Sequence, residues 1–165
     1  MVTGDQPYWK FKQYPLTDNK GAIDKWRKKC KEYDDYADLE FETTVNTLAA
    51  MKRELWTDPE YKARGFSIIP YKKMTSWEDI GELRFTNAAK TPLRVFGFFR
   101  EEVGEFVMLA GAVEDNKKYD PADIRNICVD RKQLVERGRD TPIDFDFLTE
   151  DKEEDEDGYL RALIR

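Results

Sequence analysis

The chain has 165 residues, of which 40% are hydrophobic, 13% aromatic and 38% charged, and its formal net charge is -6. This length suits one compact domain, and the apolar fraction supplies a core that needs neither disulfides nor a metal. Because charged residues interrupt every apolar run well before the roughly 18 residues of a membrane-spanning helix, the composition excludes a transmembrane protein.

Histidine is absent, and the chain has two cysteines, Cys30 and Cys128. Without histidine, a Ser-His-Asp triad, a Cys-His pair and an HExxH zinc site are all excluded. The cysteines lie far apart and are expected to be reduced, buried small residues. The N-terminal residues lack the apolar stretch of a signal peptide. The sequence therefore predicts a cytoplasmic protein that uses no metal or other cofactor.

The first half of the chain is predicted to form one strand and two helices. Residues 7–15 alternate large apolar and polar side chains between two prolines, which predicts a short edge strand. Apolar residues then recur at spacings of three and four in residues 16–33, so an amphipathic helix is expected there. A second helical pattern covers about residues 36–55. The short break at Asp34 and Asp35 predicts that the two helices form an antiparallel hairpin.

The middle of the chain changes to the pattern of strands. Residues 57–79 contain prolines and a glycine, and are expected to be irregular. Residues 82–86, 93–100 and 105–113 are rich in Phe, Val and Leu and are separated by segments typical of turns. This pattern predicts an antiparallel meander of three strands.

A last helix is expected between clear boundary signals. Asp120 would be its N-cap and Pro121 its first residue, while Gly138 would stop it. The order strand, helix, helix, three strands, helix predicts an α+β fold with the helices on one face of an antiparallel sheet. Residues 1–139 would form this domain, and residues 140–165 would form an acidic tail with an apolar end.

Two arginines are predicted to face each other in this meander. With the first hairpin centred on Ala89, Arg84 pairs with Arg94 on one exposed face of the sheet, and Glu82 lies on the same face. Two opposed guanidinium groups destabilise a sheet unless an anion or a carboxylate lies between them. The pair therefore marks either an anion site or a local ion pair with Glu82.

A second basic group lies just before the last helix. Lys117, Lys118 and Tyr119 precede Pro121, and a loop that enters a helix can hold a phosphate through its N–H groups and lysine charge. An ordinary solvated turn is the alternative. The five cations within residues 25–31 have helical spacing and are expected on a solvated outer face.

The order of elements and the segment GELRFTNAAKTPLRVFGFFREEVGEFVMLAGAVEDNKKYDPADI, residues 81–124, resemble the RelE/ParE superfamily of bacterial toxins, nearest to its HigB-like branch. The shared features are ELRF, a turn, an arginine-led aromatic strand, a hydrophobic strand, a lysine-bearing loop and a proline-started helix. This resemblance implies a RelE-like fold, in which a helical hairpin packs on an antiparallel sheet and a C-terminal helix follows.

The resemblance also implies a function. Such a protein is the toxin of a type II toxin-antitoxin system and cleaves mRNA on the ribosome without a metal. Its partners are an antitoxin protein, the ribosome and mRNA, and no membrane. The implied catalytic residues are Arg84, Arg94, Lys117, Lys118 and Tyr119, which would stabilise phosphate charge and move protons. Further RNA contacts are implied for Arg64, Lys72, Lys73 and Arg139.

Two alternatives to the endonuclease stay open. One is a non-catalytic RelE-fold regulator that binds protein or RNA, and the other is a gyrase-directed toxin of the ParE type, because one fold serves several functions.

The acidic tail adds a further hypothesis. Residues 140–165 hold ten acidic and three basic side chains. A tethered acidic run can occupy a basic face intramolecularly and compete with RNA phosphate. The tail is therefore either autoinhibitory or a disordered solubilising segment.

Overall fold

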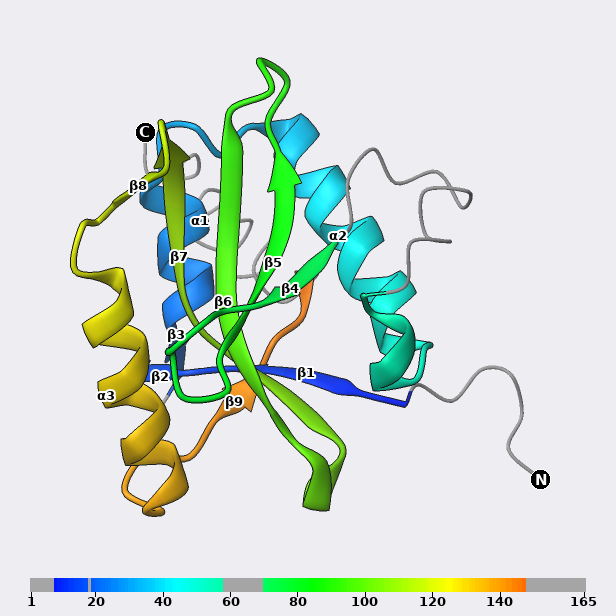
Figure 1. Ribbon diagram of the computed structural model, residues 1–165, viewed down its shortest axis with the longest axis vertical. Coiled ribbons are helices and arrows are strands. Elements are labelled where there is room, and N and C mark those ends of the chain that lie inside the picture. Colours follow the sequence, from blue (N-terminus) through cyan, green and yellow to red (C-terminus); the bar gives the residue numbers. More distant parts are fainter. Residues whose placement is uncertain (1–7, 18, 58–69, 148–165) are drawn as a thin grey trace, which may run out of the picture.

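Figure 1 shows the computed structural model of the protein, which describes residues 8–17, 19–57 and 70–147. Within these ranges the chain forms three α-helices, one seven-stranded sheet and a separate two-stranded sheet. The large sheet is mostly antiparallel, so the expected α+β class is confirmed. None of the helices in these ranges is both long enough and apolar enough to cross a membrane.

The described residues contain three α-helices and nine strands. The helices are α1 (Ala22–Lys29), α2 (Asp35–Ala49) and α3 (Ile124–Glu136). The large sheet contains β1 (Lys10–Gln13), β4 (Tyr71–Lys73), β5 (Gly81–Thr86), β6 (Pro92–Arg100), β7 (Glu105–Asp115), β8 (Lys118–Asp120) and β9 (Ile143–Asp144). The small sheet pairs β2 (Pro15–Thr17) with β3 (Lys20–Gly21). The strand order of the large sheet is β4-β5-β6-β7-β1-β9, and β8 pairs with β7.

The antiparallel meander of β5, β6 and β7 forms the centre of the large sheet, as the sequence predicts. Its first hairpin pairs Arg84 with Arg94, which confirms the register expected from a turn centred on Ala89. Strand β1 lies inside the sheet, parallel to β7 on one side and antiparallel to β9 on the other. The prediction of an edge strand in residues 7–15 is therefore wrong, because β9 covers its outer side. One edge of the sheet is β4, which lies in a stretch expected to be irregular.

Helices α1 and α2 cover one face of the meander, and Figure 1 shows α1 behind β7 and α2 to the right of β5. Asp34 caps α2 by accepting a hydrogen bond of 2.8 Å from the backbone N–H of Ala37, so the predicted break between the helices is confirmed. The Phe41 ring of α2 stacks on Phe85 of β5, with 4.8 Å between ring centroids. Both helices are shorter than predicted, and a 3-10 turn, η1 (Arg53–Leu55), follows α2.

Strand β7 contains a bulge that changes which face its residues point to. The register between β6 and β7 shifts after Phe96, at Gly97, and leaves Leu109 of β7 as an extra residue. Arg131 of α3 donates a hydrogen bond of 2.7 Å to the carbonyl oxygen of Leu109. The extra residue is thus held by a side chain from α3.

Helix α3 covers the face of the sheet opposite α1 and α2. Its Ile124, Cys128 and Val135 pack with Phe98 and Val107 in a second hydrophobic core. The prediction that all helices share one face is therefore wrong. The meander projects large apolar side chains from both faces, and each face needs its own cover.

The start of α3 also differs from the prediction. Asp120 ends strand β8 and Pro121 lies between that strand and the helix, so the helix begins at Ile124. Pairing with β7 draws this stretch into the sheet, which overrides the local helix-start signal. The predicted end is confirmed, because Gly138 adopts the left-handed φ of 73° that commonly terminates a helix.

The compact fold continues beyond residue 139, where the sequence analysis places the start of the tail. Strand β9 pairs with β1, and Phe145 and Phe147 pack against Phe41 of α2. The stretch up to Phe147 therefore belongs to the core. The acidic run of residues 150–157, and with it the proposed autoinhibitory contact, lies outside the described residues.

Replacing Phe147 tests whether this last stretch is part of the core. Phe147 is 7% exposed, so Phe147→Ala should lower the free energy of unfolding by about 3 kcal/mol through lost burial and a cavity. The matched control is Leu39→Ala on the 63% exposed Leu39, which should change it by less than about 0.5 kcal/mol. Urea unfolding followed by circular dichroism measures both, and equal effects would contradict the packing of this stretch.

Candidate functional site

Arg84 and Arg94 share the face of the sheet opposite α1 and α2. Arg94 is only 4% exposed, so the prediction of an exposed arginine pair is wrong for this residue. Its guanidinium lies 2.9 Å from a carboxylate oxygen of Glu114 and 3.8 Å from one of Glu82. Arg84, whose side chain is 30% exposed, lies 3.7 Å from the other oxygen of Glu82. Two carboxylates thus compensate the two opposed arginines.

Tyr119 completes an arginine cluster, which we define as Glu82, Arg84, Arg94, Glu114 and Tyr119. The Tyr119 hydroxyl donates a hydrogen bond of 3.1 Å to Glu82. Burial raises the pKa of Glu82, although Arg94 acts in the opposite direction. Burial and then the charge of Glu82 raise the pKa of Tyr119, so its hydroxyl is a proton donor and not a base at neutral pH. The cluster is electrically balanced and holds one phenolic proton.

Lys117 and Lys118 lie at the turn between β7 and β8. Asn116 and Lys117 have φ values of 49° and 66°, which are typical of the two-residue turn of a β-hairpin. Both lysines are exposed, and α3 begins only at Ile124. The predicted phosphate loop at a helix N-terminus is therefore wrong, because a strand occupies the stretch between the lysines and the helix.

The surroundings of Lys118 and Tyr119 are acidic. Both residues line a hollow of about 730 Å³ beside the end of β7. The charged residues of its lining are Glu32, Lys90, Glu114, Asp115, Lys118 and Asp120. Four carboxylates against two ammonium groups give the hollow a net negative charge, which repels a phosphate.

The other predicted RNA contacts are dispersed. Lys72 pairs with Glu82 across β4 and β5, so it projects on the face that carries the arginine cluster. Lys73, the next residue, points to the opposite face. Arg139 is exposed after the end of α3. Arg64 lies outside the described residues. The structure therefore brings Lys72 near the cluster and leaves Lys73 and Arg139 apart from it.

A basic groove that the sequence does not single out runs beside α1. It has a volume of about 450 Å³, and its basic lining residues are Lys20, Lys25, Lys28 and Lys29. We refer to these four residues as the lysine groove. All four lysines are exposed, and Lys20, Lys25 and Lys29 form no ion pair with any residue that the structure describes.

In the sequence, the lysine groove is indicated only by the helical spacing of the lysines in residues 25–31, and that spacing predicts a solvated helix face. The turn of β2 and β3 brings Lys20 and Leu16 alongside α1 and makes this face one wall of a groove. A local pattern cannot indicate that approach, because it depends on how the small hairpin packs.

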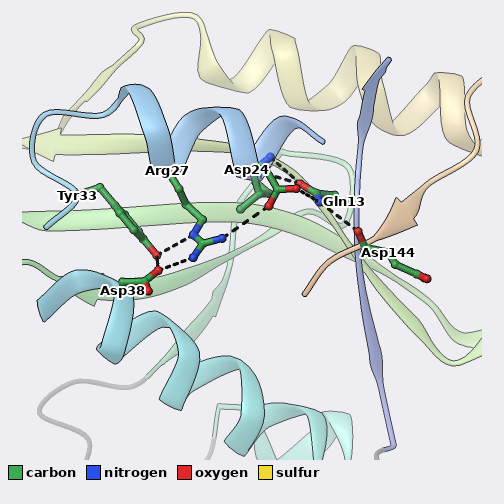
Figure 2. Close-up of polar contacts among 7 residues, drawn as sticks. Gln13, Asp24, Arg27, Tyr33, Asp38 and Asp144 are labelled. Carbon is green, nitrogen blue, oxygen red and sulfur yellow. Dashed lines mark hydrogen bonds and ion pairs between the residues drawn. The ribbon is translucent and has the colours of Figure 1, made fainter. Parts of the chain in front are cut away.

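A partly buried polar network holds Asp24, whose carboxylate lines this groove, and Figure 2 shows its members. Asp24 accepts a hydrogen bond of 2.8 Å from Gln13 and lies 3.6 Å from the guanidinium of Arg27. Arg27 donates at 2.6 Å to Asp38, which also accepts from the Tyr33 hydroxyl at 2.6 Å. The side-chain oxygen of Gln13 accepts two backbone N–H groups at the start of α1. The network fixes α1 and directs Asp24 toward the protein, while the lysines face outward.

The described residues do not support a metal site or a nucleophilic cysteine. The described residues offer no group of three or more Cys, Asp or Glu side chains that can hold a metal ion. Burial raises the pKa of the Cys128 thiol to about 12, so it is not a nucleophile at neutral pH. Comparison with protein-family models, with curated proteins and with solved structures found no match. The arginine cluster and the lysine groove are thus the two features that bear on function.

The burial of Arg94 changes what its replacement should do. Arg94→Ala leaves Glu82 and Glu114 without their main partner in a buried setting, so it should lower the free energy of unfolding by about 3 kcal/mol or more. Arg84→Ala removes a more exposed guanidinium and should cost about 1 kcal/mol or less. Chemical denaturation of both variants measures the difference. If Arg94→Ala unfolds like the parent protein, the cluster does not have the structural role assigned to it.

Proposed function

We propose that this protein is a RelE-like RNA-binding protein that uses the lysine groove and does not cleave its ligand. The observation that carries the proposal is the contrast between its two basic sites. In the arginine cluster, two glutamates compensate the buried Arg94. In the lysine groove, four exposed ammonium groups stand against one carboxylate among the described lining residues. A surface with this excess of positive charge favours a polyanionic ligand.

RNA is the polyanion that the resemblance to the RelE/ParE superfamily implies. Support for a RelE-like fold comes from the order of the main elements, since a strand, two helices, a three-stranded meander and a helix occur in this order in the described chain. Phosphates that replace counterions around the four lysines supply affinity without a sequence requirement. The acidic hollow beside Tyr119 disfavours the same phosphates.

A second candidate is the ribosome-dependent mRNA endonuclease toxin, held inactive by an antitoxin. One observation favours it: among the described residues, the Nε atoms of Arg84 and Arg94 are buried and have no hydrogen-bond partner. An N–H group of this kind can donate a hydrogen bond to a phosphate oxygen. Cleavage would require the glutamates to move away from the arginines, with Tyr119 as the proton donor.

Mapping of mRNA 5′ ends after induced expression in a bacterial host separates the two candidates. The binding protein is expected to leave mRNA intact, because the charge that would stabilise a phosphorane is already compensated. Codon-phased cleavage that disappears in Arg84→Ala would overturn the proposal in favour of the toxin. Arg84→Ala suits this purpose because its side chain is partly exposed.

Matched double variants test the location of RNA binding. Lys25→Glu/Lys29→Glu should weaken binding of a fluorescent single-stranded RNA by about tenfold or more at low salt, because two attractive phosphate contacts become repulsive. Lys117→Glu/Lys118→Glu makes the same change of charge at two other exposed lysines and should alter affinity by less than about twofold. Fluorescence anisotropy measures both. The reverse order of effects would place RNA at the turn between β7 and β8 and contradict the proposal.

A further inference from the structure

One edge of strand β7 is open over a short stretch. Through Met108, β7 pairs with β1 on this edge, and from Val113 onward it pairs with β8. No strand of the described chain lies beside residues 109–112 on that edge. Residues of α1 and α3 flank the opening, and a hollow of about 270 Å³ occupies it.

The floor of this edge hollow is apolar. Trp26, Gly111 and Ile127 are among its lining residues, together with Leu16 from the small hairpin. Gly111 is required for this shape, because a Cβ atom there would lie 2.2 Å from the Trp26 ring. The ring can therefore lie directly against the strand and form one wall of the hollow.

The rim of the edge hollow is cationic and joins the lysine groove. Lys25, Lys29 and Leu16 line both the edge hollow and the lysine groove. Arg131 adds a guanidinium at the α3 side, where it is positioned by its hydrogen bond to Leu109 and lies 5.0 Å from the Tyr14 ring. An apolar recess and a row of ammonium groups thus form one continuous trough.

We infer that this trough binds single-stranded RNA, with one unstacked base in the edge hollow and the neighbouring phosphates on the lysine groove. The inference rests on the proposed RNA binding and names the form of the RNA. A base in a duplex is stacked and paired, so it cannot enter a recess, whereas a single strand can turn a base outward. The volume of about 270 Å³ lies just below the range of drug-sized sites and suits a single planar ring system.

A ligand that is only negatively charged would match part of the trough and leave its apolar recess without a partner. A ligand with phosphate and no base, such as inorganic polyphosphate, gains from the lysines and nothing from Trp26 or Ile127. An acidic peptide likewise matches the lysines but offers carboxylates and no planar base. The apolar recess at the end of a cationic row therefore favours a ligand that carries rings and phosphates in alternation.

The test measures binding of three probes to the full chain by fluorescence anisotropy and competition. The probes are a single-stranded RNA of about eight nucleotides, the corresponding duplex, and inorganic polyphosphate. Leu16→Ser changes a residue of the trough that is 37% exposed, so folding is little affected. Leu39→Ser makes the same change at an exposed leucine of α2 that lines neither hollow.

The single-stranded RNA should bind more tightly than the duplex. Leu16→Ser should weaken the binding of the single-stranded RNA by about fivefold and leave the binding of polyphosphate unchanged. Leu39→Ser should leave the binding of both probes unchanged. Equal affinity for the single strand and the duplex, or an equal loss for polyphosphate in Leu16→Ser, would overturn the base-binding role. Competition by a glutamate-rich peptide as effective as that by the single strand would overturn it as well. In each of those outcomes RNA binding through the lysines still stands, whereas failure of all probes to bind would contradict the proposed function itself.

Discussion

Strand β7 must be covered on both faces, and the rest of the architecture follows from that requirement. Its eleven residues are mostly buried, so α1 packs against one face and α3 against the other. The bulge at Leu109 turns the second half of the strand and gives Arg131 a carbonyl oxygen to bind. Because β1 and β8 cover only the two ends of its outer edge, the middle of that edge stays open between the helices. The trough that we assign to RNA is a consequence of this arrangement.

The burial of Arg94 is the second constraint, and it bears directly on function. A guanidinium that is removed from water requires compensating carboxylates, and Glu82 and Glu114 supply them from the two neighbouring strands. The same neutralisation that makes this arginine tolerable in the fold makes it a weak partner for phosphate. The lysines of α1 lie at the surface instead. The compensated charge inside the fold and the surface charge that we assign to ligand binding are therefore located on different elements.

The parts of the fold that could be predicted from the sequence depend on local patterns. The turn around Ala89 sets the register of its hairpin, and Gly138 ends α3, because each effect is decided within a few residues. The remaining features depend on partners far along the chain. Pairing with β9 makes β1 an interior strand, and glutamates from two other strands compensate the charge of the buried Arg94. The position of Lys117 and Lys118 in a β-hairpin turn, and not in a loop that enters α3, has the same cause, since β8 forms only beside β7.

The central claim is that RNA contacts the trough between α1 and α3 and not the arginine cluster. Ultraviolet cross-linking of the full chain to a single-stranded RNA, followed by identification of the modified peptides, tests this claim most directly. The account predicts cross-links in the peptides that contain Trp26 of α1 and Ile127 of α3, because both side chains line the edge hollow. Cross-links confined to peptides that contain Arg84, Arg94 or Tyr119 would contradict it.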